Sequence, residues 1–107
     1  MAGDKIPELT NGEFEEFTKK GIVLVDFFAE WCMPCLMMAP VIDDLSEEFK
    51  GKIKFGKVNV DDNSKLAQKF DVTSIPTFVV FKDGSKVGQF TGAIPQEDFS
   101  DKLKKFA

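Results

Sequence analysis

The sequence predicts an α/β domain with a mixed β-sheet, and three observations support this. The chain has 107 residues, 43% of them hydrophobic, which is enough for one compact core and too little for two. Helical and strand periodicities alternate along the chain, and no repeat or linker interrupts them. Two strand patterns joined by Asp83-Gly84 indicate an antiparallel hairpin near the C-terminus. We therefore expect a single domain over residues 1–107.

The N-terminal part of the chain is expected to contain an edge strand, a helix and a buried strand. Residues 1–9 are mostly polar and are assigned to a short edge strand. Thr10 or Asn11 caps a first helix, and Gly21 ends it. The buried face of this helix carries Phe14 and Phe17. Residues 22–29 are mainly β-branched and aromatic, which predicts a strand buried on both faces.

A long helix is expected over residues 33–50. Pro34 lies in its first turn, where a missing N–H is tolerated, and Gly51 is the expected stop. Pro40 lies inside the pattern and predicts a kink. The apolar positions recur at helical spacing and comprise Cys35, Met38, Ile42, Leu45 and Phe49. One face of this helix should therefore pack against the sheet.

The C-terminal half continues the alternation of strands and helices. Residues 52–60 predict a second central strand, and residues 64–70 a short helix. The two strands of the hairpin are expected at residues 77–82 and 87–90. Pro95 opens a last helix, whose apolar positions are Phe99, Leu103 and Phe106. Helices between strands, followed by a hairpin, favour a sheet that contains both parallel and antiparallel pairs.

The composition excludes several classes of function. Eighteen acidic residues against fourteen basic ones give a net charge of -4, which does not favour binding to a nucleic-acid backbone. All the basic residues are Lys, so no guanidinium is available to clamp a carboxylate or a phosphate. Because His is absent, no Ser-His-Asp or Cys-His catalytic system and no imidazole metal site is expected. Carboxylate, amine and sulfur chemistry remain.

The hydropathy pattern indicates neither a signal peptide nor a membrane span. The start of the chain lacks a basic segment followed by an apolar stretch. The longest apolar run, residues 22–29, is interrupted by Asp26. A cytoplasmic location is therefore expected.

The two cysteines form a Cys-x-x-Cys motif between the buried strand and the long helix. This spacing on a first helical turn brings Cys32 and Cys35 to one face, within reach of a short-loop disulfide. Cys32 should lie at the helix N-terminus, where unsatisfied N–H groups and the helix dipole favour a thiolate nucleophile. Cys35 lies on the packed face and is suited to resolve a mixed disulfide. The motif therefore predicts a redox-active pair.

Two other interpretations of this pair are weaker. A purely structural disulfide would contribute only roughly 2 kcal/mol across so short a loop, and cytosolic disulfides are usually catalytic or sensory. Zinc or an iron-sulfur cluster usually requires about four ligands, whereas the chain offers two thiolates unless a dimer shares the site. No metal site is expected in one copy of the chain.

Asp26 interrupts the buried strand with a carboxylate. An unpaired buried charge costs several kcal/mol, so burial should raise the pKa of Asp26. A protonatable carboxyl just before the motif could exchange a proton with Cys35 during turnover. Lys57, in the middle of the next predicted strand, is the natural partner of Asp26. The alternative is that one or both side chains simply face a solvated edge.

These residues resemble the active-site segment of the thioredoxin family. Residues 25–35 read Val-Asp-Phe-Phe-Ala-Glu-Trp-Cys-Met-Pro-Cys, and the resemblance covers nearly the whole chain. Further matching segments, in family order, are Ala39-Pro40, Lys57-Val58-Asn59-Val60-Asp61, Ser74-Ile75-Pro76-Thr77, Phe81-Lys82-Asp83-Gly84 and Gly92-Ala93. The resemblance implies the thioredoxin fold, with a central mixed five-stranded sheet flanked by four helices.

The resemblance also implies roles for individual residues. Cys32 would be the attacking thiolate and Cys35 the resolving thiol, with Asp26 and Lys57 as the buried acid-base pair. The peptide bond between Ile75 and Pro76 would be cis and face the disulfide. The implied target-binding residues are Trp31, Met33, Pro34, Ser74, Ile75, Pro76, Gly92 and Ala93. No cofactor is implied; the implied partners are protein disulfides and a thioredoxin reductase, and a monomer is expected.

Two positions depart from the family pattern and bear on the function. Met33 stands where Gly is familiar between the cysteines, and Leu36 stands where Lys or Arg is usual. The changed dipeptide should alter the reduction potential, and the missing cation should slightly weaken stabilisation of the Cys32 thiolate. Three functions are therefore weighed: a general protein-disulfide reductase, which we favour; an oxidase, isomerase or glutaredoxin-like enzyme; and a protein-interaction module in which the thiols are incidental.

Overall fold

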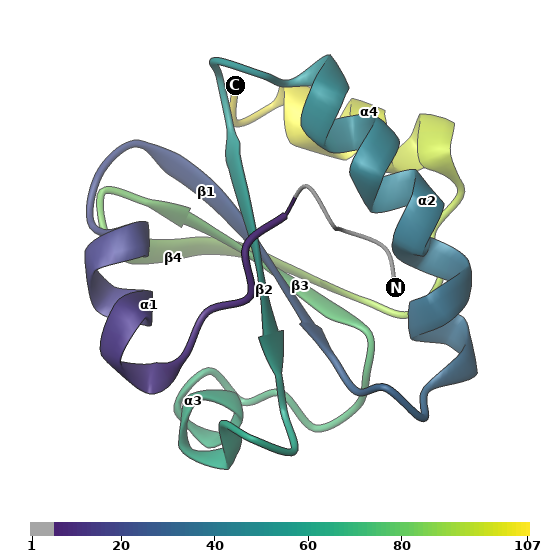
Figure 1. Cartoon of the computed structure of the whole chain (residues 1–107). Helices are drawn as coiled ribbons and strands as arrows, with labels where there is room; N and C mark the ends of the chain where they lie inside the picture. The colour runs from purple at the N-terminus through teal and green to yellow at the C-terminus, as the bar shows by residue number, and fades with distance from the viewer. Residues whose placement is uncertain (1–5) are drawn as a thin grey trace.

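The computed structural model describes residues 6–107, which form a mixed sheet covered by helices on both faces (Figure 1). The elements in chain order are α1 (Asn11–Thr18), β1 (Ile22–Phe28), α2 (Met33–Glu48), β2 (Lys54–Asn59), α3 (Ser64–Lys69), β3 (Thr77–Lys82), β4 (Ser85–Thr91) and α4 (Gln96–Lys104). The strand order is β2-β1-β3-β4; β1 pairs parallel with β2 and antiparallel with β3, and β4 pairs antiparallel with β3. The predicted α/β class and mixed sheet are confirmed.

The prediction of five strands is wrong among the described residues, where the sheet has four. Residues 1–5 of the expected edge strand lie outside the described part of the chain. The rest of it makes one isolated bridge, between Glu8 and Lys57, through Leu9 N to Lys57 O and Lys57 N to Pro7 O. Because Pro7 has no N–H to donate, the described segment does not extend this pairing into a ladder.

The element boundaries follow the local capping and turn signals. Thr10 is the N-cap of α1, and its backbone N–H donates to Glu13 Oε1 at 3.0 Å. Asp83 and Gly84, with φ of 50° and 90°, form the two-residue turn between β3 and β4. Positive φ at both positions matches the twist of a tight hairpin, and glycine adopts it without strain. The predicted hairpin is confirmed, although β4 is longer than residues 87–90.

The central strand β1 divides the core into two layers. Leu24 faces the layer that contains α2 and α4, whereas Val23 and Val25 face the layer that contains α1 and α3. Figure 1 shows α2 beside α4, with α1 and α3 in other parts of the view. The first layer is packed by Ile42, Leu45, Phe78, Phe99 and Leu103, among others. Because β1 is buried on both faces, the segment that follows it is held on a rigid base.

A side-chain hydrogen bond joins α2 and α4. Ser100 Oγ donates to Glu48 Oε2 at 2.7 Å in a partly buried position. Hydrogen bonds to charged groups are stronger than neutral ones, but alanine has a higher helix propensity than serine and offsets part of the loss. We therefore expect Ser100→Ala to lower the free energy of unfolding by about 1 kcal/mol. Urea denaturation measures this change.

Ser46→Ala is the matched control for that substitution. Ser46 Oγ donates to Asp43 O within α2, so this hydrogen bond does not join α2 to another helix or strand. We expect the control to change the free energy of unfolding by less than about 0.5 kcal/mol. Equal effects of the two substitutions would contradict a role for Ser100 in joining the helices.

No helix within residues 6–107 is long and apolar enough to cross a membrane. The longest, α2, has 16 residues.

Candidate active site

The two cysteines lie where β1 gives way to α2. Cys32 is the N-cap of α2 in an extended conformation, and Cys35 is in the first turn. Their Cα atoms are 5.3 Å apart, and the two sulfurs form a disulfide. The backbone N–H of Cys35 donates to Cys32 Sγ at 3.2 Å. This N–H belongs to the first turn and has no acceptor within the helix, so it points at the sulfur of Cys32, where it would stabilise negative charge.

Both sulfurs are well shielded in this oxidised form. Cys32 is 3% exposed and Cys35 is 6% exposed, and both pack in a small cluster with Phe28 and Ala29. They differ in what they face, because Cys32 lines an open groove and Cys35 does not. The sequence pattern suggested that Cys35 would be the more shielded thiol, but the two exposures are similar. The difference between the two cysteines is that only Cys32 lines the groove.

The groove beside Cys32 has a volume of about 460 Å³ and a mainly apolar lining. Of the sequence-predicted contact residues, it brings together Trp31, Met33, Pro34, Ser74 and Ile75. Pro76, Gly92 and Ala93 are not part of its lining. Gly92 N donates to Pro76 O at 2.8 Å, which links the two segments directly behind Ile75. The peptide bond between Ile75 and Pro76 is cis, as the family resemblance implied.

Sequence reasoning missed four residues around this groove. Val60, Val72 and Thr73 complete its lining. Asp61 Oδ2 accepts a hydrogen bond from Trp31 Nε1 at 2.9 Å, which holds the indole ring at the rim. Val60 and Asp61 both stood in a matching segment, although nothing there marked them as groove residues. Val72 and Thr73 had no signal, because they reach the motif only when the loop after α3 lies against it.

Asp26 is buried in the middle of the sheet. Its exposure is 9%, and its Oδ1 has no hydrogen-bond partner among the described residues. Burial raises the pKa of Asp26 from 3.8 to about 7, against the lowering effect of the Lys57 charge. The alternative that Asp26 faces a solvated edge is therefore wrong. A carboxyl with a pKa near neutrality can both take and release a proton.

Lys57 lies beside Asp26 on the neighbouring strand. The parallel register of β1 and β2 places the two residues opposite each other. Lys57 is partly buried, and its Nζ lies 5.5 Å from the centroid of the Phe28 ring. Its charge therefore acts on Asp26 at short range, within an environment of reduced dielectric constant. The predicted proximity of the two residues is confirmed by this register.

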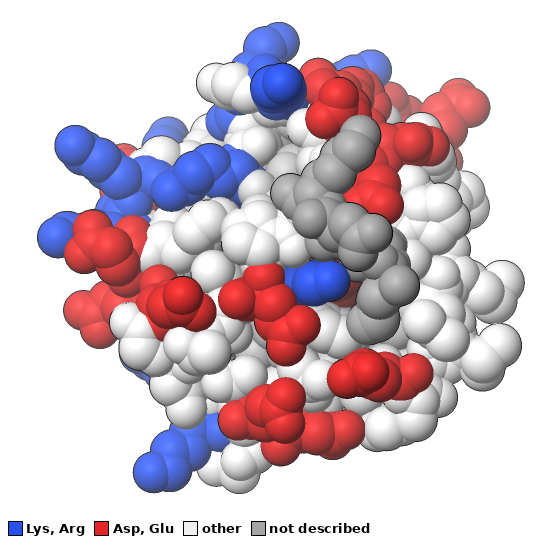
Figure 2. Space-filling model, viewed as in Figure 1, with Lys and Arg blue, Asp and Glu red and all other residues white. Residues whose placement is uncertain are grey.

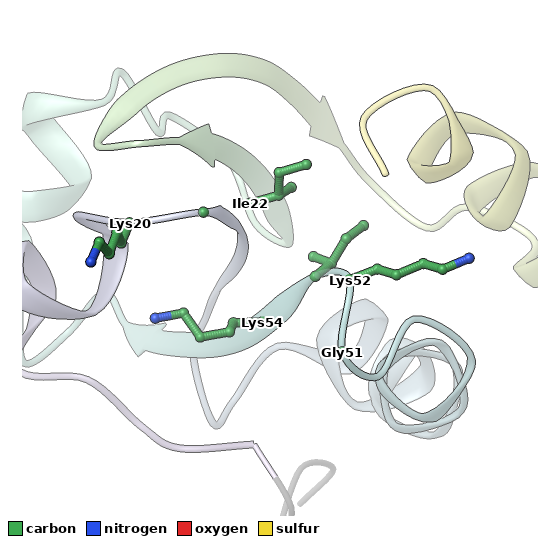
Figure 3. A pocket seen from close by; sticks show the side chains of 7 residues that line it. Lys20, Ile22, Gly51, Lys52 and Lys54 are labelled. Carbon is green, nitrogen blue, oxygen red and sulfur yellow. The ribbon is translucent and has the colours of Figure 1, made fainter.

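A second hollow lies at the other end of β1 and β2. It is lined by Lys20, Gly21, Ile22, Gly51, Lys52, Ile53 and Lys54. Figure 3 shows Lys52 extending away from Lys20 and Lys54. Lys54 Nζ donates to Phe17 O at 2.9 Å. Because the three ammonium groups do not converge, this hollow does not form an anion site.

The described part of the chain contains no cluster of three or more His, Cys, Asp or Glu residues that could hold a metal ion. The chemistry that the structure brings together is therefore that of the two sulfurs, the buried carboxyl of Asp26 and the amine of Lys57.

A redox-active cysteine pair that opens a helix after a buried central strand defines a class of protein, the thiol–disulfide oxidoreductases with an α/β fold. The similarity of the chain to known protein families identifies its family. The family model described as Thioredoxin matches residues 5–105, so the chain belongs to the thioredoxin family. The activity of this chain is the reduction of protein disulfides.

Individual relatives agree with this assignment. The chain is 44% identical to a thioredoxin of Staphylococcus haemolyticus over 100 residues, covering 94% of this chain and 96% of the relative. It is 42% identical to a thioredoxin of Staphylococcus aureus over the same shares. A solved mutant thioredoxin from Halobacterium salinarum superposes with a TM-score of 0.86 at 30% identity, covering 99% of this chain and 94% of that one.

Proposed function

We propose that Cys32 is the attacking thiolate of this reductase and Cys35 the resolving thiol. One observation carries the assignment: Cys32 lines the groove, whereas Cys35 is not part of its lining. The helix N-terminus stabilises a thiolate at Cys32. A target reaching into the groove meets Cys32 first, so the order of the two thiols in the reaction follows.

The proposed cycle transfers two electrons. The Cys32 thiolate attacks one sulfur of the target disulfide, which forms a mixed disulfide and releases the other target sulfur as a thiolate. The Cys35 thiolate then attacks the Cys32 sulfur, which releases the second target thiolate and forms the Cys32–Cys35 bond. At this point the target is reduced and the cysteine pair is oxidised. A thioredoxin reductase then returns two electrons and two protons to the pair, which restores its two thiols.

Asp26 is proposed to accept the proton of the Cys35 thiol and Lys57 to moderate its charge. A pKa of about 7, raised by burial, supports a carboxyl that takes up a proton at neutral pH and later gives it back. The position of Lys57 opposite Asp26 supports the pairing, because its charge lowers the same pKa. Asp26 thus acts on the resolving step rather than on the first attack.

The groove is proposed to bind an extended segment of the target protein. Its lining includes Trp31, Met33, Pro34, Ser74 and Ile75, and the backbone before Pro76 would pair with the target strand. The loop that carries Gly92 and Ala93 would flank this strand. We further propose that residues 1–107 form one domain that works as a cytoplasmic monomer, with protein disulfides and a thioredoxin reductase as partners and no nucleic acid.

The reduction potential tests this function. The Cys32–Cys35 couple is titrated in defined dithiothreitol buffers, with Trp31 fluorescence as the signal and alkylation to count thiols. We expect a two-electron potential at or below about -250 mV, near the value of about -270 mV typical of thioredoxins, despite Met33 and Leu36. A value above about -180 mV would instead favour an oxidase or isomerase. Turnover with NADPH and a thioredoxin reductase tests the recycling step.

A further inference from the structure

Large apolar side chains are exposed mainly at one place on the described surface. Those that stand out are Trp31, Met33, Leu36, Met37 and Val87. Four of these five lie within residues 31–37, at the start of α2. Met33 is 65% exposed and Met37 is 68% exposed, so neither contributes its full side chain to the core. A cluster of this kind on a small protein indicates a surface that contacts something else.

The exposed side chains of α2 share one helix face. Met33 and Met37 are one turn apart, Leu36 lies between them, and the exposed Pro40 follows on the same face. We call these four residues the α2 apolar patch. No charged residue occurs between Glu30 and Asp43. Figure 2 shows an uncharged right-hand edge where the lower half of α2 lies in Figure 1.

The α2 apolar patch is continuous with the groove beside the disulfide. Met33 belongs to both, and Trp31 and Pro34 line the groove next to it. Cys32 is 3% exposed, so a target sulfur reaches it only when the target is pressed against this rim. Leu36 and Met37 follow Met33 on the same helix face, so the patch adjoins the groove at Met33.

We propose that the α2 apolar patch extends the target site and selects protein disulfides that carry apolar side chains next to the cysteine attacked by Cys32. This inference rests on the proposed function and adds the class of target to it. Apolar target side chains gain by burying surface against Met33, Leu36 and Met37. Charged target side chains lose hydration there, and residues 31–42 offer no charged side chain in return. The difference between these two cases is the specificity.

Methionine suits this task because its side chain is unbranched and adapts to different shapes. A patch built mainly from Met33, Met37 and Leu36 can accept several apolar side chains rather than one. Its selectivity is thus for a class of target surface and not for a single sequence.

The test compares two synthetic disulfide-linked peptides that differ only in having Leu or Ser on both sides of the target cysteine. The fully reduced protein is mixed with excess peptide, and Trp31 fluorescence reports a single turnover. We expect the wild-type protein to favour the Leu peptide roughly tenfold, through a lower half-saturating concentration. In the double variant Leu36→Gln/Met37→Gln this preference should fall about fivefold, with the rate at saturation unchanged.

Val87→Gln is the matched control. Val87 is an exposed apolar residue on β4, outside the patch and the groove, so we expect its substitution to leave the preference unchanged. Glutamine keeps good helix propensity at both α2 positions, and the reduction potential and unfolding midpoint of each variant are measured alongside. A double variant with an altered preference but an unaltered potential supports target binding rather than a change in the thiols.

Three results would overturn the inference. A wild-type protein that reduces both peptides equally well has no apolar selectivity, although its proposed function stands. A double variant that keeps the wild-type preference places the selectivity elsewhere. If sedimentation shows a dimer that the double variant dissociates while the preference is unchanged, the patch joins two copies of the chain. A protein that reduces neither peptide contradicts the proposed function itself, a result distinct from these three.

Discussion

Cys32→Ser should lower the rate of protein-disulfide reduction by roughly 10³-fold or more, to the level of the uncatalysed exchange. A serine hydroxyl is not ionised at neutral pH and forms no disulfide with a target sulfur. The N-cap position and the N–H of Cys35 then have no thiolate to stabilise. The measurement is the rate of reduction of a disulfide-bonded protein substrate, with dithiothreitol as the electron source.

Cys35→Ser separates the two thiols when the variant is reduced, freed of dithiothreitol and mixed with the same disulfide-bonded substrate. This variant keeps the attacking sulfur but lacks the group that resolves the mixed disulfide, so we expect a stable one-to-one adduct between Cys32 and the target. Mass spectrometry under non-reducing conditions detects it. An adduct that forms with Cys32→Ser and not with Cys35→Ser would reverse the assignment of the two cysteines.

Asp26→Asn should stabilise the protein at alkaline pH by an amount on the order of 4 kcal/mol and have little effect near pH 4. Burial raises the pKa of Asp26 in the folded protein to about 7, above the value of 3.8 that we take for the unfolded chain. Between these two values the folded state binds the extra proton. The free energy of unfolding therefore falls as pH rises from about 4 to 7, and the loss is complete above pH 7.

Urea denaturation of the wild type and of Asp26→Asn, at pH values from 4 to 8.5, measures this difference. Taking the difference removes the titration of the other carboxyl groups, which are common to both proteins. Asp44→Asn, on the exposed side of α2, is the control and should leave the pH dependence unchanged. A pH profile of Asp26→Asn parallel to that of the wild type would show that Asp26 does not carry the effect.

The order of helices and strands was largely predictable because its signals are local. Thr10 caps α1, the Asp83-Gly84 pair makes the hairpin turn, and Pro34 sits in the first turn of α2. Each of these depends on a few neighbouring residues and on backbone geometry. The error at the N-terminal edge concerns a local signal that the family resemblance outweighed. Pro7 lacks the N–H that a longer ladder with the neighbouring strand needs.

Some residues of the candidate site were predictable from the sequence, and others were not. Cys32 and Cys35 follow from their spacing at a strand–helix junction, and the position of Asp26 within an apolar run already indicated a perturbed carboxyl. Val72 and Thr73 could not be found in this way, because they reach the groove only through the folding of the loop after α3. Val60 lay in a matching segment, but nothing there indicated that it lines the groove. The family resemblance placed Met33 among the target-binding residues, but nothing in the sequence indicated that the exposed apolar face continues to Met37.

The amino-acid sequence thus carries the chemistry of this thioredoxin-family protein, namely two thiols one helical turn apart and a carboxyl in the preceding strand. Covalent spacing and the local helix start specify these features. The environment of each group is a property of the folded chain. Burial of Asp26, the different surroundings of Cys32 and Cys35, and the exposed apolar face of α2 arise from contacts between segments distant in sequence, because solvent exclusion is produced by packing.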